Sequence, residues 1–274
     1  MDTNKPPLIS IITVTYNAQS VLEQTIQSVI NQTYKNIEYI IVDGGSTDGT
    51  LEIIIKYKSQ ISSWISEKDK GIYDAMNKGI RMAKGSLIGM INAGDFYMPK
   101  TVELVWEASL KNPLVGIFHG KINLLEENGD LIKIKTPNTD LSCLSQGMCV
   151  YHPTFFVSKA IYELNGLYDT EFKIAADFDF TLRNYLSKTS FYYIDELLAN
   201  FKIGGLSHVQ NIKAIDEVVK SLIKNGYSQS DVQKTNSFLL KKDKRNQRMF
   251  LWHSIFKKIL PRFVLQKMAQ SIKK

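Results

Sequence analysis

An apolar run in residues 87–97, LIGMINAGDFY, stops at a polar turn that ends in Asp95. A buried strand that delivers one carboxylate to its C-terminal end is a common way for α/β enzymes to hold a metal ion or a phosphate. Mg²⁺ or Mn²⁺ bound with a nucleotide often takes only one or two carboxylates, and phosphate oxygens and water complete the octahedron. Asp95 is therefore a candidate metal ligand, and the alternative is a polar residue that merely caps a strand.

Two other predicted strands also end in polar turns. Residues 8–15 lead into Tyr16, and residues 37–43 lead from Asp43 into the turn GGSTDG. Because open parallel sheets bind ligands outside the carboxyl ends of their strands, we expect the three turns to meet. The Tyr16 ring can stack on a base, the Asp43 carboxylate can accept the N–H of a uracil ring, and Gly44 lets the backbone approach a ligand. Together these residues predict a nucleotide site.

The first part of the chain contains the elements that would bring these turns together. Apolar runs that predict strands alternate with segments whose apolar residues recur at helical spacing. Strands are expected at 8–15, 37–43, 63–66 and in the run that ends at Asp95, and helices from a capping box at 20–23 to residue 30, at 50–57 and at 72–83. This alternation predicts a mostly parallel α/β sheet with right-handed connections and flanking helices.

The pattern changes after residue 112. Residues 121–135 predict a hairpin around a turn at 127–130, and a polar loop follows at 137–147. A helix is expected at 175–187 and two short strands at 190–203. The sequence thus predicts one α/β domain with a mixed sheet in its second half, followed by a tail from about residue 205.

The basic charge of the chain is concentrated at its C-terminal end. The formal net charge is +7, but residues 241–274 contain eleven Lys or Arg and one Asp, so residues 1–240 carry a charge of −3. An acidic body argues against a nucleic-acid-binding protein. No apolar segment reaches the roughly 20 residues that cross a bilayer, and the polar start MDTNKPP predicts no signal peptide. Cys143 and Cys149 are expected to be reduced thiols in a reducing compartment.

Several spaced segments resemble one enzyme family. These are SIITVTYNAQ with its continuation TIQSVINQTYKNIEYIIVDGGSTDGT, the run EKDKGIYDAMNKGIRMAKGSLIGMINAGD, and the later FKIAADFDFTLR and FKIGGLS. In this order, over residues 7–208, they resemble the family 2 glycosyltransferases, especially bacterial members that build O-antigen and exopolysaccharide repeat units. The resemblance implies the GT-A fold, a nucleotide-diphosphate sugar donor and inversion at the anomeric carbon. It also implies a nucleotide-sugar-binding half at 1–112 and an acceptor half at 113–204.

The resemblance assigns donor-binding roles to residues at three strand ends and at the start of a helix. The full donor-binding set is Val14, Tyr16, Asn17, Asp43, Gly44, Asp69, Lys70, Gly71, Asn77, Asn92, Ala93, Gly94 and Asp95, with Lys78 beside it. Within this set, Val14 and Tyr16 would line the uracil pocket and Asp43 would contact the base. Asp95 falls on the family's metal-binding aspartate and implies Mn²⁺ or Mg²⁺ as cofactor, with His208 as a further candidate ligand. The family commonly has another aspartate where Gly94 stands, and this departure leaves the metal affinity open.

Two carboxylates in the segment AADFDFTLR, Asp177 and Asp179, stand two residues apart at the start of a predicted helix. Inversion needs a base that takes the proton from the acceptor hydroxyl, and the resemblance places Asp177 in that role. A positive helix N-terminus stabilises the ionised form of a carboxylate. The family base commonly follows a glutamate, whereas here it follows Ala176. Asp179 is expected either to hold structure or to touch the acceptor, His152 to contact the acceptor, and His119 to be structural.

The segment 205–274 is expected to form a C-terminal helical tail. Its part RMFLWHSIFKKILPRF interleaves apolar and aromatic residues with Lys and Arg, which is typical of a basic amphipathic helix at an anionic membrane interface. The alternative is a helix that packs on the catalytic body. With the resemblance, this tail implies an acceptor on undecaprenyl diphosphate and a cytoplasmic enzyme held peripherally on the inner face of the cell membrane.

The sequence as a whole predicts an inverting hexosyltransferase that moves Glc, Gal or GlcNAc from a UDP-sugar to a lipid-linked saccharide. A sugar-phosphate nucleotidyltransferase is the second enzyme hypothesis, but TYNAQS after the first strand lacks the glycine-rich basic loop that it would need. The third hypothesis, a non-enzymatic membrane-binding protein, rests on the basic tail alone. The sequence has neither a Walker loop nor a G-x-G-x-x-G motif, which argues against a kinase and a dehydrogenase.

Overall fold

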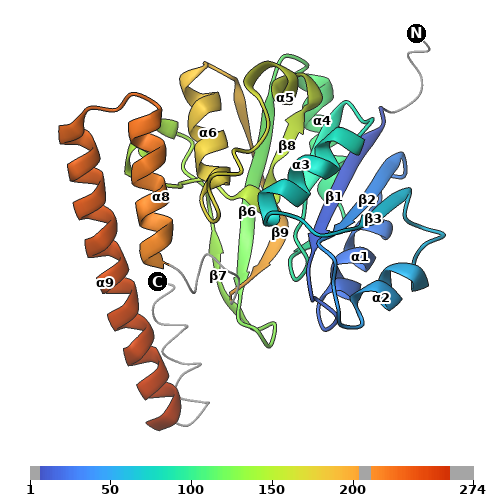
Figure 1. Cartoon of the computed structure of the whole chain (residues 1–274), viewed down its shortest axis with the longest axis horizontal. Helices are drawn as coiled ribbons and strands as arrows, with labels where there is room; N and C mark the ends of the chain where they lie inside the picture. The colour runs from blue at the N-terminus through green and yellow to red at the C-terminus, as the bar shows by residue number, and fades with distance from the viewer. Residues whose placement is uncertain (1–6, 204–210, 260–274) are drawn as a thin grey trace.

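The computed structural model of the chain describes residues 7–203 and 211–259, except for the side chains of residues 211 and 246–259. A nine-stranded sheet runs through the body, and helices cover both of its faces (Figure 1). The strand order is β3-β2-β1-β4-β8-β6-β9-β5, and β7 pairs with β6 off this path. The predicted α/β class with a mixed second half is therefore confirmed.

The parallel part of the sheet comes from the first ninety residues. Its strands are β1 (Ile9–Thr15), β2 (Ile37–Asp43), β3 (Ser63–Ser66) and β4 (Leu87–Met90), with β1 between β2 and β4 and β3 at the edge. The connecting helices are α1 (Leu22–Ile30), α2 (Thr50–Lys56) and α3 (Ile72–Met82). Every residue of β1 is buried, because α1 covers one face of the sheet and α3 covers the other.

The second half of the chain adds mostly antiparallel pairs. β8 (Phe156–Ser158) pairs with β4 and with β6 (Ile117–Leu125), and β7 (Leu131–Lys135) forms the expected hairpin with β6. β9 (Phe191–Lys202) runs parallel to β6 and ends beside the short β5 (Phe96–Tyr97). This half also contains α4 (Thr101–Lys111), α5 (Lys159–Asn165), α6 (Ala176–Leu186) and the 3₁₀ turns η1 (Leu141–Gln146) and η2 (His152–Thr154).

Some local predictions differ from the structure. Two short strands are expected at 190–203, but the structure has the single strand β9 there. The pairing of β9 with β6 shifts in register between Gly120 and Ile122, and the strand continues through this irregularity. The helices α4 and α5 and the strand β8 have no counterpart among the predicted elements. The capping box is also wrong: α1 starts without a side-chain cap, and Glu23 instead accepts hydrogen bonds from Lys56 at 2.6 Å and from the Tyr57 hydroxyl at 2.7 Å. Glu23 therefore joins α1 to the end of α2.

Two long helices, α8 (Asn211–Lys224) and α9 (Gln229–Ile259), follow the sheet and lie side by side at the edge of the molecule (Figure 1). Val218 and Leu222 of α8 and Val232 of α9 join a buried apolar cluster with Phe178 and Leu182 of α6. The first part of the predicted tail therefore packs on the α/β body. Burial of this cluster removes apolar side chains from water and fixes α8 against α6.

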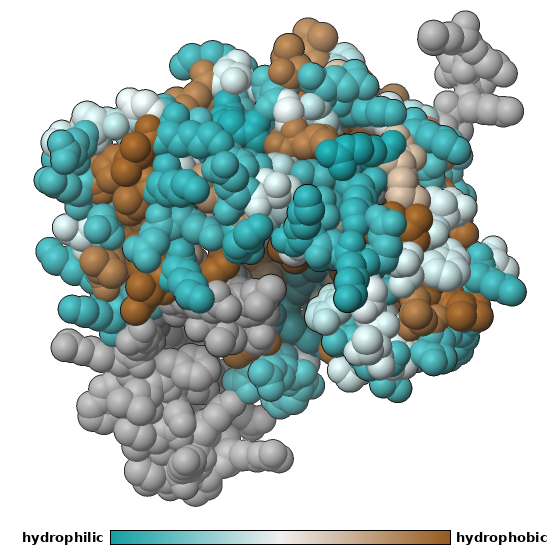
Figure 2. Space-filling view, in the orientation of Figure 1, coloured by the Kyte–Doolittle hydropathy of each residue, from teal (hydrophilic) through white to brown (hydrophobic). Residues whose placement is uncertain are grey.

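The surface gives no sign of a broad apolar face on the side shown in Figure 2, where hydrophilic residues predominate and hydrophobic residues form separate small patches. Within residues 7–203 and 211–259, no helix is both long enough and apolar enough to cross a bilayer. The segment expected to be amphipathic, 248–263, falls on side chains outside the described part of the chain. Its role at a membrane stays a prediction.

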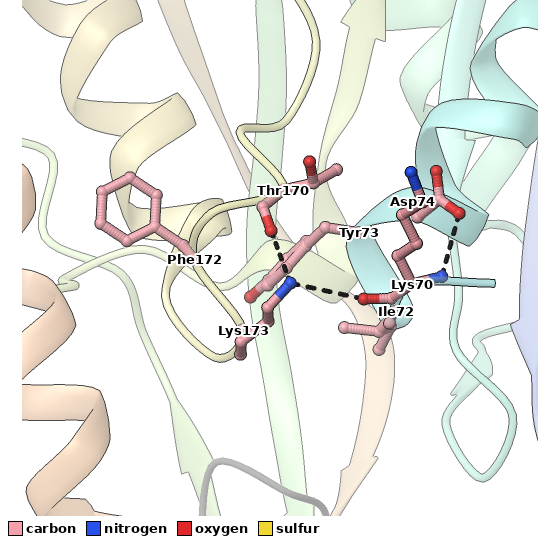
Figure 3. A pocket seen from close by; sticks show the side chains of 8 residues that line it. Lys70, Ile72, Tyr73, Asp74, Thr170, Phe172 and Lys173 are labelled. Atoms are coloured by element: carbon pink, nitrogen blue, oxygen red, sulfur yellow. Dashed lines mark hydrogen bonds between the residues drawn. The ribbon is translucent and has the colours of Figure 1, made fainter.

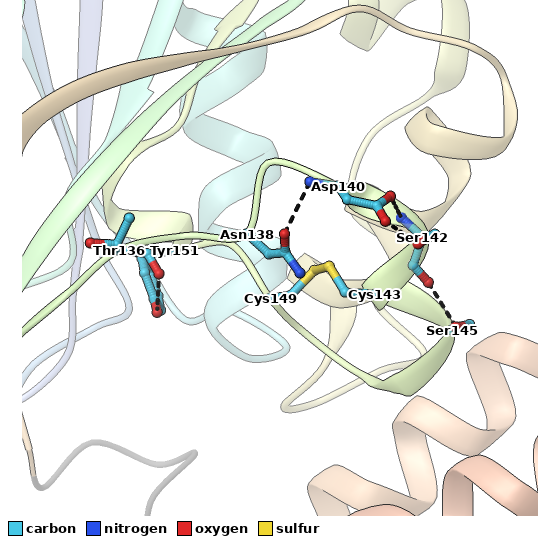
Figure 4. Close-up of a disulfide and its surroundings, with 8 residues drawn as sticks. All are labelled: Thr136, Asn138, Asp140, Ser142, Cys143, Ser145, Cys149 and Tyr151. Atoms are coloured by element: carbon cyan, nitrogen blue, oxygen red, sulfur yellow. Dashed lines mark hydrogen bonds between the residues drawn. A yellow bond between two sulfur atoms is a disulfide. The ribbon is translucent and has the colours of Figure 1, made fainter.

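Cys143 and Cys149 form a disulfide in the loop around η1 (Figure 4). The Asp140 carboxylate accepts hydrogen bonds from the N–H of Ser142 at 3.0 Å and from its hydroxyl at 2.8 Å, which fixes the start of the turn. The turn brings the Cα atoms of the two cysteines to 6.2 Å, within the usual range for a disulfide. The prediction of reduced thiols is therefore wrong, because sequence spacing does not reveal how tightly this loop folds.

His119 is expected to destabilise the protein in mild acid. It is 2 % exposed on β6, beside the rings of Phe155, Phe191 and Tyr193, and burial lowers its pKa from 6.5 to about 4. Between these values the unfolded chain binds a proton that the folded chain does not, so stability falls as the pH drops. Urea denaturation should show that wild-type unfolding free energy falls about 2 kcal/mol more between pH 7 and pH 5 than that of His119→Phe. Equal losses in the two proteins would contradict this role.

Candidate active site

Three strand ends lie together at the carboxyl edge of the parallel sheet. The Gly44 N–H donates to the carbonyl of Thr15 at 2.9 Å, and the Ala93 N–H donates to the carbonyl of Val14 at 3.1 Å. The turns after β2 and β4 are thus hydrogen-bonded to the end of β1 from its two sides. The prediction that these turns meet at one edge is confirmed.

Tyr16, Gly44 and Asp69 come from three different segments and lie against one another. A Cβ atom on Gly44 would collide with the Asp69 carboxylate and would lie 3.4 Å from Cδ2 of Tyr16. A side chain at position 44 would therefore displace the Asp69 carboxylate. The Tyr16 side chain is 62 % exposed, so most of its surface is open for stacking against a planar ligand.

Asp43 and Asn17 shape the turn that follows β2. Asp43 is completely buried, and its Oδ2 atom accepts the N–H groups of Gly45 at 3.1 Å and Ser46 at 3.0 Å and the hydroxyl of Ser66 at 2.6 Å. Asn17 donates its backbone N–H to the Ser46 hydroxyl at 2.8 Å. These bonds give Asp43 a structural role in the turn. Its expected contact with a base stays a prediction, and it would require the turn to release the carboxylate.

The segment before α3 carries Asp69, Lys70 and Gly71. Asp69 accepts the Gly71 N–H at 2.8 Å, and Gly71 has a φ of 121°, a conformation that favours glycine. Lys173, in the segment before α6, donates to the carbonyl groups of Lys70 at 3.4 Å and Thr170 at 2.8 Å, as Figure 3 shows. The loop before α3 and the loop before α6 are therefore joined through Lys173.

Asn77 of α3 is hydrogen-bonded to the backbone of the segment before α6. It is 3 % exposed, its Nδ2 donates to the Tyr168 carbonyl at 2.8 Å, and its Oδ1 accepts the Tyr168 N–H at 3.0 Å. These bonds give Asn77 a structural role, and its donor-binding assignment stays a prediction. Lys78 Nζ lies 2.8 Å from Glu67 and 3.7 Å from Asp74, in ion pairs beside the loop.

Asp95 ends the turn after β4 and is 7 % exposed. The Thr25 hydroxyl of α1 fixes this turn, because it donates to the Asp95 carbonyl at 2.7 Å and accepts the Gly94 N–H at 3.0 Å. The Asp95 carboxylate accepts the Lys202 N–H at 3.2 Å. Burial raises the pKa of Asp95 to about 7, and Lys202 offsets this only in part. Gly94 has a φ of 102°, so an aspartate at that position would be strained in this backbone.

The surroundings of Asp95 fit a divalent cation. A buried carboxylate is costly to ionise, and a bound cation offsets that cost. At the same edge, Asn92 Oδ1 and Thr15 Oγ1 are buried and have no hydrogen-bond partner among the described residues. Within that part of the chain, no three His, Cys, Asp or Glu side chains form a metal-binding group, so phosphate oxygens would have to complete the coordination. His208 lies outside the described residues, and its assignment stays a prediction.

Asp177 lies in the first turn of α6 and is partly exposed. Its Oδ1 atom accepts the Tyr73 hydroxyl at 3.1 Å and the Phe178 N–H at 2.9 Å. The Tyr73 hydroxyl also lies 2.6 Å from the carbonyl of Ile174, which it can reach as a donor. Burial and the Asp177 charge hold the pKa of Tyr73 well above its usual range, so this hydroxyl keeps its proton. Because Tyr73 lies two residues after Gly71, Asp177 is attached to the same end of α3 as the loop 69–71.

Asp179 lies in the protein interior, unlike Asp177. It is completely buried, its Oδ2 atom accepts Arg183 Nε at 2.8 Å, and its Oδ1 atom accepts the Ser221 hydroxyl at 2.8 Å and the Asn225 amide at 3.1 Å. Protein groups therefore bind both carboxylate oxygens. Of the two roles expected for Asp179, the structural one is confirmed and the acceptor contact is wrong.

His152 lies in η2 and is 7 % exposed. Its Nε2 atom is 2.8 Å from the Tyr168 hydroxyl. Burial lowers the pKa of His152, and the charge of Asp177 opposes this in part, so the ring is neutral at pH 7. The histidine is thus a buried residue near Asp177, and its contact with an acceptor stays a prediction.

Three residues that hold this site together, namely Thr25, Tyr73 and Lys202, are not among the predicted site residues. Thr25 and Lys202 reach Asp95 across separations of 70 and 107 residues, and no local pattern signals such contacts. Tyr73 stands on the buried face of an amphipathic helix, where an aromatic residue is usually part of the core. Its hydroxyl group is the one feature of that position that could have suggested a polar partner.

Comparison with known proteins gives a consistent result. The family model described as "Glycosyl transferase family 2" matches residues 10–162. An uncharacterized glycosyltransferase of Mycobacterium tuberculosis is 34 % identical over 180 residues, which covers 65 % of this chain and 68 % of the relative. The chondroitin synthase of Escherichia coli is 27 % identical over 240 residues, which covers 85 % of this chain but only 32 % of the synthase.

Solved structures share the fold. Residues 1–349 of S. aureus TarS, in complex with UDP-GlcNAc, superpose with a TM-score of 0.64 at 17 % identity, covering 85 % of this chain and 71 % of the other. The mannosyltransferase PcManGT from Pyrobaculum calidifontis, in complex with GDP-Man and Mn²⁺, gives a TM-score of 0.63 at 15 % identity, covering 98 % of this chain and 85 % of the other. At these identities the similarity establishes the architecture, and the expected GT-A fold is confirmed.

Proposed function

The chain belongs to glycosyltransferase family 2, and from this premise we propose that it transfers a hexose from a UDP-sugar to a hydroxyl group of a saccharide acceptor, with inversion. The proposal is supported by the arrangement of residues at the carboxyl edge of the sheet. Tyr16, Gly44 and Asp69 are in contact at the sheet edge that also holds Asp95, and Asp177 is hydrogen-bonded to the helix that starts beside them. This arrangement supports a donor site with a general base beside it.

The donor nucleotide binds at the carboxyl ends of β1 and β2 in this proposal. The exposed Tyr16 ring stacks on the uracil, and Val14, Asn17 and Asp43 form the surrounding wall. The diphosphate lies along the Gly44 backbone and the loop of Asp69, Lys70 and Gly71, where the Lys70 ammonium group and the open space beside Gly71 suit phosphate oxygens. The UDP-GlcNAc complex of TarS, a protein of the same fold, supports a UDP-sugar. The transferred sugar is glucose, galactose or N-acetylglucosamine.

Asp95 is the residue that would hold Mn²⁺ or Mg²⁺, with Asn92 as a neutral oxygen at the same edge. When bound, the ion offsets the charge that develops on the leaving diphosphate. Thr25 and Lys202 keep the Asp95 carboxylate in place through the backbone of the turn and through the Lys202 N–H. The Mn²⁺ complex of PcManGT supports a divalent cofactor.

Asp177 is the general base of the proposed reaction. It takes the proton from the acceptor hydroxyl as that oxygen attacks the anomeric carbon on the face opposite the leaving group. The Tyr73 hydroxyl donates to Oδ1 of Asp177, which orients the carboxylate and leaves its other oxygen to accept the proton. A base on that side gives inversion in a single displacement.

The acceptor in this proposal is a saccharide on a lipid diphosphate such as undecaprenyl diphosphate, in O-antigen, capsule or exopolysaccharide repeat-unit synthesis. The support is the basic C-terminal end, where residues 241–274 hold eleven Lys or Arg against one Asp. Such a segment is attracted to anionic lipid headgroups and would hold the enzyme peripherally on the inner face of the cell membrane. Acceptor contacts are expected from the loop 137–151 and from His152.

Substitution of Tyr16 tests the stacking role. In Tyr16→Ala the KM for the UDP-sugar should rise about tenfold, because base–aromatic stacking is worth roughly 1–3 kcal/mol. Tyr16→Phe keeps the ring and should keep a wild-type KM. Since the side chain is 62 % exposed, neither change should lower the melting temperature appreciably. An unchanged KM in Tyr16→Ala, measured by UDP release at varied donor concentration, would remove Tyr16 from the base site.

The function itself is tested by UDP release from UDP-glucose, UDP-galactose and UDP-N-acetylglucosamine, with Mn²⁺, with Mg²⁺ and with EDTA. A synthetic lipid-diphosphate-linked sugar serves as acceptor, and reactions without it measure hydrolysis. We expect one UDP-sugar to turn over in an acceptor-dependent and metal-dependent manner. Turnover of a GDP-sugar with no UDP-sugar reacting would contradict the proposed donor.

A further inference from the structure

Helix α8 contacts the loop that leads into Asp177. A carboxylate from this helix reaches that loop: Glu217 accepts the N–H of Lys173 at 2.9 and 3.0 Å through its two oxygens, of Ile174 at 2.8 Å and of Ala175 at 2.9 Å. Three successive backbone donors just before α6 thus converge on one charged acceptor. Charge-assisted hydrogen bonds are the stronger class of protein hydrogen bonds, so this set fixes the backbone conformation of residues 173–175.

A second set of contacts, from the end of this helix, holds the chain after Asp177. Ser221 of α8 and Asn225, the first residue after it, donate to the buried Asp179 carboxylate at 2.8 Å and 3.1 Å, and Arg183 donates to it at 2.8 Å. Residues 217 and 221 are four apart, so they lie on one face of α8, and Asn225 follows directly after the end of this helix. Together these residues bind the backbone two to four residues before Asp177 and the side chain two residues after it.

Neither contact reaches the proposed donor or acceptor. Glu217 has all of its described hydrogen bonds to backbone N–H groups, and Asp179 is completely buried. The match to the family model ends at residue 162, so it includes neither Asp177 nor α8. The role of α8 therefore has to be inferred from the geometry alone.

We propose that Glu217 is a positioning residue for Asp177, and that α8 is thereby a working part of the active site rather than a tail. The inference rests on the proposed function, in which Asp177 is the base. A base acts only within hydrogen-bond reach of the proton that it abstracts, and a displacement of about 1 Å can cost about 100-fold in rate. Release of three N–H groups from Glu217 would let the loop 173–175 shift and carry Asp177 with it.

The test compares Glu217→Ala, Glu217→Gln and the matched control Asp216→Asn. The control also removes one negative charge from α8, but from an exposed side chain. We expect kcat of Glu217→Ala to fall about 100-fold while KM for the UDP-sugar stays within about twofold. Glu217→Gln retains one carbonyl oxygen as acceptor and should recover kcat to within about tenfold of the wild type. Asp216→Asn should have wild-type kinetics. UDP affinity by calorimetry, which does not depend on turnover, should be the same in all four proteins.

The outcomes separate the inference from the proposed function. Wild-type kcat in Glu217→Ala, or a kcat for Glu217→Gln no higher than for Glu217→Ala, would overturn the positioning role while leaving the proposed function intact. A parallel loss of kcat and UDP affinity would mean that Glu217 stabilises the whole domain, and it would also overturn the role. A wild-type enzyme that turns over no UDP-sugar would overturn the proposed function, and the inference with it.

Discussion

Asp177→Asn is expected to lower kcat for sugar transfer by about 10³-fold, within the range of 10²–10⁴ that general base catalysis contributes. The amide has the size and shape of the carboxylate and keeps an oxygen that can accept from Tyr73, but it cannot take a proton from the acceptor. The KM for the UDP-sugar should stay close to the wild-type value, because the donor-binding residues are untouched. The measurement is steady-state UDP release with the preferred donor and saturating acceptor.

The control for this substitution is Asp130→Asn, an identical change in the exposed turn of the β6–β7 hairpin. It should leave kcat unchanged. Full activity in Asp177→Asn would contradict the assignment of the base. Asp179 could not take over the role without a rearrangement, because Arg183, Ser221 and Asn225 bind both of its oxygens.

Asp95→Asn is expected to lower kcat/KM by about 10²–10³-fold in the presence of Mn²⁺, the usual loss when one electrostatic stabiliser of a leaving group is removed. The amide keeps an oxygen that can accept the Lys202 N–H, so the turn should stay folded. The remaining activity should be insensitive to EDTA, whereas the wild type should lose its activity with the chelator.

A readout apart from catalysis distinguishes metal binding from structural damage. Mn²⁺ together with UDP should raise the melting temperature of the wild type, because a ligand that binds only the folded state stabilises it. The same addition should leave the melting temperature of Asp95→Asn almost unchanged. If Asp95→Asn showed the wild-type shift and the wild-type response to EDTA, Asp95 would not be the metal ligand.

The parallel half of the fold could be predicted because its signals are local. Alternating apolar strands and amphipathic helices fix β1 to β4 and α1 to α3, and polar strand ends in a parallel sheet must meet at its carboxyl edge. The meeting of the turns after β1, β2 and β4 follows from that rule. The antiparallel half was harder to predict from sequence, because β8 has only three residues and the pairing of β9 with β6 shifts in register.

The supporting contacts of the site could not be predicted, because they join residues distant in sequence. Asp95 depends on Thr25 and Lys202, and the segment before Asp177 depends on Glu217, 42 to 44 residues downstream. The resemblance assigns the base to Asp177 and leaves two roles open for Asp179, and only the fold shows that Asp179 is completely buried. The same holds for Asn77, whose amide is a plausible ligand by type but is used by the backbone of Tyr168.

The most direct test of the account is the anomeric configuration of the product, read by proton NMR from the coupling of the anomeric proton of the transferred sugar. A β-linked product is expected from an α-linked UDP-sugar, because Asp177 activates an acceptor hydroxyl for a single displacement opposite the leaving diphosphate. An α-linked product would contradict it. Retention would require a second displacement or a front-face mechanism, and a base that acts on the acceptor from the opposite side explains neither.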